Sequence, residues 1–96
     1  MNKDDIVRQL SSSKLTLKGR FGVARLALFG SMARDQGGPR SDVDILVSFD
    51  GPATSERYFG VQFFLEDLLG RPVDLVTDKA LRPQLRPTIE AEAIHV

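Results

Sequence analysis

The chain has 96 residues, of which 42% are apolar, and its 13 basic and 13 acidic residues give a net charge of zero. This size and apolar content are typical of one folded domain, residues 1–96, and argue against a disordered or fibrous class. The absence of cysteine excludes disulfides, thiolate metal sites and thiol nucleophiles. No apolar run reaches the roughly 20 residues of a membrane span, and the N-terminus lacks the apolar core of a secretory signal. We therefore expect a cytoplasmic protein.

The two signs of charge are distributed unevenly along the chain. Residues 1–40 carry eight basic and three acidic side chains, whereas residues 41–96 carry five basic and ten acidic ones. A net charge of zero does not favour binding to a nucleic-acid backbone, which usually requires a basic surface. One possibility is that a small anionic ligand binds between the basic half and the acidic half, with a metal ion held by the acidic half. The plainer alternative is that the two halves neutralise each other on the surface.

The first third of the chain predicts helices followed by a buried strand. Asn2 or Asp4 can cap a first short helix, and the serines at 11–13 interrupt it before a second helical stretch over 14–20. Residues 23–29 are apolar except for Arg25, which is typical of a strand buried on both faces. We expect this segment to be the central strand.

A short helix is expected over 31–36, ended by the stop signal at 37–39, and a second strand over 41–49. The odd positions of that strand are apolar from Val43 to Phe49. Asp42 and Asp44 lie on the opposite face, and because strand side chains alternate with period two they must project to the same side.

The remaining chain alternates helix and strand once more. Ser55 can cap a helix that ends at Gly70, with Phe59, Phe63 and Phe64 as part of an apolar stripe that is more typical of a core than of a base-stacking platform. Residues 72–77 predict a third strand. The tail over 78–93 is expected to be helical in its later half, with helix starts near its two prolines, and 94–96 form an edge strand or a frayed end. This order predicts an α/β fold with a small mixed sheet flanked by helices.

Asp42 and Asp44 form a pair that needs a neutralising partner. Like charges a few ångströms apart raise each other's pKa, unless a cation such as Mg²⁺ binds between carboxylates and substrate phosphates. Alternatively, the pair could lie on the solvent face of a half-exposed strand, which is common for an isolated Asp-x-Asp. Gly30 and Ser31 form a turn at which a backbone can approach a phosphate closely, although a plain strand-to-helix junction has the same residues.

The Gly-Ser turn and the Asp-x-Asp pair, taken together with the spacing between them, are a more specific signal of function than either motif alone. Gly30-Ser31, ten intervening residues and then Asp42-Val43-Asp44 resemble the signature of the minimal nucleotidyltransferases, a family of the DNA polymerase β superfamily. The later Asp74, within Pro72-Val73-Asp74-Leu75-Val76, matches the third acid that this family has on another strand. The resemblance covers nearly the whole chain and implies the nucleotidyltransferase catalytic-core fold.

The resemblance also implies a role for each matching residue. Gly30 and Ser31 would hold the β- and γ-phosphates of ATP, and Arg34 would face the triphosphate or else form an ordinary surface ion pair. Asp42, Asp44 and Asp74 would ligate two Mg²⁺ ions, and Asp74 would accept the proton of the acceptor hydroxyl. Asp35 departs from the family pattern, which often has Gly there, and places an acid near the expected phosphate site. His95 is not expected to bind metal.

No acceptor-binding segment is visible within these 96 residues. Minimal members of the family resemble antitoxins paired with HEPN-type toxins, so the resemblance implies AMP transfer from ATP to a tyrosine of such a partner, within a homo- or hetero-oligomer. Two alternatives stay open: an antitoxin that acts by contact without catalysis, and a small-molecule nucleotidyltransferase that works as an oligomer. Neither a membrane nor a nucleic acid is an expected partner.

Overall fold

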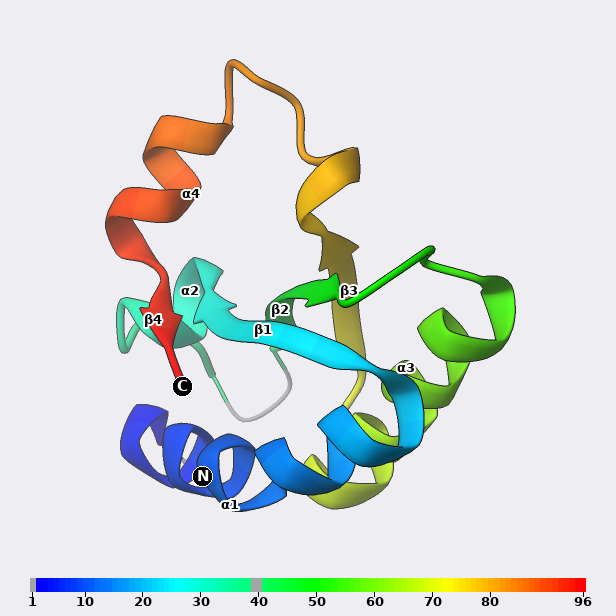
Figure 1. The fold of residues 1–96 in the computed structure, drawn as a ribbon. Helices are drawn as coiled ribbons and strands as arrows, with labels where there is room; N and C mark the ends of the chain where they lie inside the picture. The colour runs from blue at the N-terminus through cyan, green and yellow to red at the C-terminus, as the bar shows by residue number, and fades with distance from the viewer. Residues whose placement is uncertain (1, 39–40) are drawn as a thin grey trace.

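A four-stranded mixed sheet forms the centre of the computed structural model, which describes residues 2–38 and 41–96 (Figure 1). The strand order is β3-β2-β1-β4. β1 (Val23–Phe29) and β2 (Val43–Phe49) are antiparallel, β3 (Val73–Thr77) runs parallel to β2, and β4 (Ile94–His95) pairs antiparallel with the other edge of β1. The predicted α/β fold with a small mixed sheet is confirmed. The parallel pair is possible because a whole helix, α3 (Ser55–Leu69), connects β2 to β3.

The two faces of the sheet are covered differently. The helices α1 (Lys3–Phe21) and α3 lie against one face (Figure 1), where the odd-numbered residues of β2 join the main core. On the opposite face, Ala27, Phe29, Leu46 and Leu81 form a smaller cluster. The short helix α4 (Arg86–Glu92) packs on that cluster, so the face that carries the even-numbered residues of β2 is only partly covered.

The serines at 11–13 do not interrupt the first helix, and the prediction of two helical stretches was wrong. Ile6, Leu10, Ser13 and Leu17 recur at helical spacing and are all buried, and this burial outweighs the weak helix propensity of serine. The hydroxyl of Ser13 donates to the carbonyl of Leu10, so this buried hydroxyl is paired. Asn2 caps the helix in a capping box with Asp5, as one of the two predicted caps.

The segment between β1 and β2 is less helical than predicted. The helix α2 covers only Gly30–Ala33, because the backbone leaves the helical conformation at Asp35, whose φ is 59°. The helix stop signal predicted at 37–39 includes Pro39, which lies outside the described residues. The strand β2 begins at Val43 and not at residue 41, so Asp42 directly precedes the strand.

The helix α3 has the predicted bounds, but only part of its predicted apolar stripe is buried. Thr54, and not Ser55, is its N-cap, and Gly70 ends it in the left-handed conformation. Phe59 and Phe63 are 49% and 61% exposed, so the prediction that they belong to the core was wrong. Leu65 and Leu69, which belong to the same predicted stripe, are buried, and Phe64 packs partly buried against the core. Val61 is buried as well and was not predicted.

The C-terminal part follows the prediction with one addition. A 3-10 turn, η1 (Asp78–Ala80), follows β3, and Pro87 stands in the first turn of α4. Residues 94 and 95 form the edge strand that was one of the two expected states. No helix within residues 2–38 and 41–96 is long and apolar enough to cross a bilayer.

Candidate active site

The sheet brings two of the predicted acids directly opposite each other. Asp44 is the second residue of β2 and Asp74 is the second residue of β3, and the parallel register pairs one with the other. Asp44 is also paired with Phe29, the last residue of β1, in the antiparallel register. The end of β1 and the beginnings of β2 and β3 therefore meet at one place, which the sequence alone could not establish because it depends on strand order.

Gly30 lies directly against the Asp44 side chain. Its φ of 74° is a left-handed conformation that other residues rarely adopt. A Cβ atom at this position would overlap Oδ2 of Asp44. The glycine thus permits a close approach between the turn after β1 and the carboxylate on β2, which is the contact expected of a backbone that binds a phosphate beside an acid.

The surroundings of Asp44 raise its pKa to about 6, from an ordinary 3.8. Burial is the largest cause, because it penalises the charged form, and the charge and hydrogen bonding of Asp74 come next. The charge of Asp42 adds to the increase, whereas the guanidinium of Arg34 opposes it. All of the predicted charged site residues therefore act on one carboxyl group.

Glu92, at the end of α4, is a site residue that the sequence analysis did not predict. The backbone N–H of Gly30 donates to its Oε1 at 3.1 Å, and a guanidinium nitrogen of Arg34 donates to its Oε2 at 2.7 Å. These contacts join positions 62 and 58 residues apart in the chain. No local pattern around Glu92 signals this role, because the contacts of Glu92 arise only when α4 packs on the partly covered face of the sheet.

Ser31 and Asp35 complete the turn. Ser31 follows Gly30 in α2 and is partly exposed, so its hydroxyl is accessible to a ligand. The carboxylate of Asp35 is exposed and forms no hydrogen bond or ion pair within residues 2–38 and 41–96, although the backbone amide of Asp35 donates to the carbonyl of Met32 at 3.2 Å. An exposed carboxylate is screened by solvent, which limits its repulsion of an anion bound at the turn.

The three predicted metal ligands are near one another without forming a closed set. Within residues 2–38 and 41–96, no three side chains of the metal-binding types converge closely enough to hold a cation. Like charges repel, and the pKa of Asp44 is raised by burial first and then by the two further carboxylates. Hard oxygen donors of this kind are those that Mg²⁺ prefers. The chemistry of the donors therefore fits such an ion.

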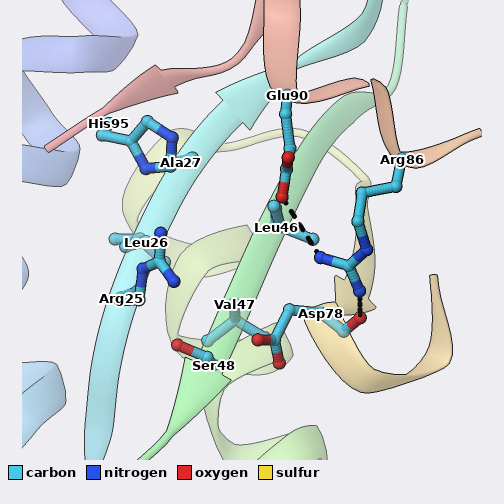
Figure 2. Close-up of a pocket in the computed structure, with 10 residues that line it drawn as sticks. All are labelled: Arg25, Leu26, Ala27, Leu46, Val47, Ser48, Asp78, Arg86, Glu90 and His95. Carbon is cyan, nitrogen blue, oxygen red and sulfur yellow. Dashed lines mark hydrogen bonds and ion pairs between the residues drawn. The ribbon is translucent and has the colours of Figure 1, made fainter. Parts of the chain in front are cut away.

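A separate hollow lies further along the same face of the sheet (Figure 2). It is lined by segments of β1 and β2 together with Asp78, Arg86, Glu90 and His95, and none of the predicted site residues borders it. Arg86 pairs there with Glu90 and donates to the carbonyl of Asp78. We place the candidate site at the acids and Gly30, because the hollow contains no comparable group of carboxylates.

The comparison with known families agrees with this geometry. The sequence profile described as "Nucleotidyltransferase domain" matches residues 10–96, which include every residue of the candidate site. The chain belongs to this nucleotidyltransferase family.

Named relatives align over almost their full length. This nucleotidyltransferase is 36% identical over 93 residues to the protein adenylyltransferase MntA of Thermococcus cleftensis, covering 97% of this chain and 94% of the relative. It is 39% identical over 93 residues to "Putative protein adenylyltransferase MJ0128" of Methanocaldococcus jannaschii, covering 96% and 92%.

Solved structures share the fold. One described as a "putative minimal nucleotidyltransferase" superposes with a TM-score of 0.82 at 36% identity, covering 98% of this chain and 95% of the other. A structure of tri-AMPylated Shewanella oneidensis HEPN toxin in complex with MNT antitoxin matches with a TM-score of 0.60 at 19% identity, covering 98% of this chain and 67% of the other. The second likeness concerns the fold alone.

Proposed function

We propose that this nucleotidyltransferase transfers AMP from ATP to a tyrosine hydroxyl of a HEPN-type partner protein, and so acts as the antitoxin of a toxin–antitoxin pair. The observation that carries the proposal is the pairing of Asp44 with Asp74 beside the Gly30 turn. The MntA relative is named as a protein adenylyltransferase, and a toxin of the HEPN type is AMPylated in the Shewanella complex.

The residues of the turn would bind the nucleotide. The amide of Gly30, the hydroxyl of Ser31 and the guanidinium of Arg34 are donors near one another and suit the β- and γ-phosphates. Because Gly30 has no Cβ, the phosphate chain can approach the backbone beside Asp44. This contact would orient the α-phosphate toward the acids.

The three acids would supply the rest of the site. Asp42, Asp44 and Asp74 would hold Mg²⁺, which when bound supplies positive charge that neutralises the carboxylates and the phosphates. Asp74 is exposed, so an acceptor hydroxyl can reach its carboxylate. We assign to Asp74 the role of general base.

In the proposed reaction the acceptor oxygen forms a bond to the α-phosphorus of ATP. The bond between that phosphorus and the oxygen leading to the β-phosphate breaks, and pyrophosphate leaves. The proton of the hydroxyl passes to Asp74. The products are an AMP ester of the acceptor and pyrophosphate, so atoms and charge are balanced without a further reactant.

The test is to incubate the protein with ATP, Mg²⁺ and the product of the adjacent gene, and then to measure intact masses. We expect the partner to gain the mass of AMP, and we expect Asp42→Asn/Asp44→Asn to abolish the gain. Asp67→Asn, an exposed acid on α3, is the matched control and should transfer normally. Inhibition of the partner by the double variant without any mass change would instead support an antitoxin that acts by contact.

A further inference from the structure

Glu92 occupies two of the donors that the proposed function assigns to the triphosphate. Its two carboxylate oxygens accept from the Gly30 amide at 3.1 Å and from Arg34 at 2.7 Å. The Glu92 side chain is only 21% exposed, whereas that of Arg34 is 46% exposed. The Glu92 carboxylate therefore lies against the turn at Gly30 and accepts hydrogen bonds there as a bound anion would.

We propose that Glu92 is an internal competitor of the nucleotide, whose carboxylate must leave Gly30 and Arg34 before the triphosphate can bind there. This inference rests on the proposed function, because that function gives the two donors to the phosphates. Carboxylate and phosphate oxygens accept the same charge-assisted hydrogen bonds, and each N–H group can serve only one of them fully. A triphosphate carries more negative charge than one carboxylate, so it can displace Glu92 from Arg34.

The element that carries Glu92 is lightly attached to the rest of the molecule. α4 itself has no buried residue. It is the chain after α4 that is held to β1, by two paired positions of β4 and by the Val96 amide, which donates to the carbonyl of Leu26. Ile89 and Ala93 pack on the small cluster without being fully buried. Elements with few buried apolar contacts open at low free energy, without unfolding the core. Glu92 can therefore withdraw while the main sheet and its covering helices stay intact.

This arrangement lowers the apparent affinity for the nucleotide. When a site is available only in a fraction of the molecules, the measured dissociation constant is the intrinsic one divided by that fraction. Removing the charge of Glu92 enlarges the available fraction. The same contact also means that empty protein keeps Arg34 neutralised and Gly30 hydrogen-bonded, so the turn is held in one conformation before the nucleotide arrives.

Calorimetric titration with inorganic tripolyphosphate, which has no base or ribose, tests the inference in metal-free buffer. We expect Glu92→Gln to bind about tenfold more tightly than wild type, since the amide is similar in shape but uncharged. Glu92→Asp, which keeps the charge but cannot span both donors, should also bind more tightly. Unchanged or weaker binding by both variants would overturn the inference, and weaker binding would make Glu92 a residue that positions Arg34.

Two controls separate competition from a general effect of charge. Asp35→Asn removes a negative charge next to Arg34 without breaking a described side-chain hydrogen bond. Glu90→Gln removes a negative charge from α4, the helix that also carries Glu92, at a position where Glu90 pairs with Arg86 (Figure 2). At about 150 mM salt each should change the affinity by less than about twofold, because exposed charges are screened. A gain in Asp35→Asn equal to that of Glu92→Gln would overturn the inference.

The same proteins distinguish this inference from the proposed function. If Glu92→Gln binds tripolyphosphate more tightly and neither wild type nor the variant transfers AMP to the partner, the competition is supported and the transferase role is refuted. Equal binding by Glu92→Gln and wild type, with transfer intact, would refute only the competition. Absence of tripolyphosphate binding by every variant would refute the competition, and the mass measurement would then decide the function independently.

Discussion

The burial of Asp44 and its two neighbouring carboxylates oppose ionisation of its carboxyl group more than the guanidinium of Arg34 favours it. Its pKa is about 6 in the folded protein, against 3.8 ordinarily, chiefly because of burial and of Asp74. Between these two values the folded protein keeps a proton that the unfolded chain has already lost. Folding is therefore favoured at low pH, and the free energy of unfolding should fall as the pH rises.

We predict that metal-free wild type loses about 1–2 kcal/mol of stability between about pH 4 and pH 6, less than the full shift implies because Asp44 is partly solvated. The Asp44→Asn variant should lack this loss, because its amide does not titrate. Urea denaturation at several pH values in the presence of a chelator measures both. Asp67→Asn should retain the wild-type slope, and a parallel slope in Asp44→Asn would contradict the assigned environment.

Gly30 should tolerate a side chain less well than another glycine with the same backbone conformation. Gly30→Ala adds the overlap with Asp44 to the strain of a left-handed residue, and we expect it to cost about 2–4 kcal/mol. Gly70→Ala is the matched control: φ is 66° there, and nothing lies within 4 Å of the added atom, so only the strain of about 1–2 kcal/mol applies.

The difference between the two glycines can be traced to one contact. In an Asp44→Ala background, the cost of Gly30→Ala should fall toward that of Gly70→Ala, because the overlapping carboxylate is gone. Thermal and urea denaturation of wild type, Gly30→Ala, Asp44→Ala and the double variant complete this double-mutant cycle. An undiminished cost in that background would show that Asp44 is not the neighbour that excludes the side chain.

At the scale of elements, the packing of α3 explains why Phe59 and Phe63 are exposed although the rest of the predicted stripe is buried. Its sequence has apolar residues on two sides, one with Phe59 and Phe63 and one with Val61, Leu65 and Leu69. Polar contacts favour the second side: Gln62 donates to the carbonyl of Val73, and Glu66 accepts from its amide. These contacts depend on where β3 lies, which periodicity within α3 does not indicate.

We predict unequal effects of truncation on the two sides of α3. Leu65→Ala should lower the free energy of unfolding by about 2–4 kcal/mol, because Leu65 is fully buried in the core. Phe63→Ala should change it by less than about 1 kcal/mol, because Phe63 is 61% exposed and only stacks on Phe59. Urea denaturation measures both, and equal losses would contradict the observed orientation of the helix.

The other elements show which features a sequence can indicate. The strands β1, β2 and β3 were predicted within two residues at each end, because their apolar runs and alternation are local signals. The continuous α1 was missed, since the burial of Ser13 by other elements outweighs local propensity. In the same way, α2 was predicted too long, because the left-handed Asp35 has no distinctive sequence signal.

For the whole molecule, the candidate site divides into local and distant parts. Gly30, Ser31, Asp42 and Asp44 could be singled out as candidates because their spacing, within one strand–turn–strand unit, resembles the family signature. The position of Asp74 required the parallel register of β2 and β3, and that of Glu92 required the packing of α4 on the open face. Tertiary structure thus determines which acids face the turn.

We propose a metal-dependent nucleotide site at Asp44 and its neighbours, and titration of ATP with and without Mg²⁺ tests this site most directly. We predict that Mg²⁺ strengthens ATP binding to wild type and that Asp44→Asn, while still folded by circular dichroism, loses at least about tenfold of that Mg²⁺-dependent affinity. Asp67→Asn should bind as wild type does. The same Mg²⁺-dependent ATP affinity in Asp44→Asn as in wild type would contradict the account.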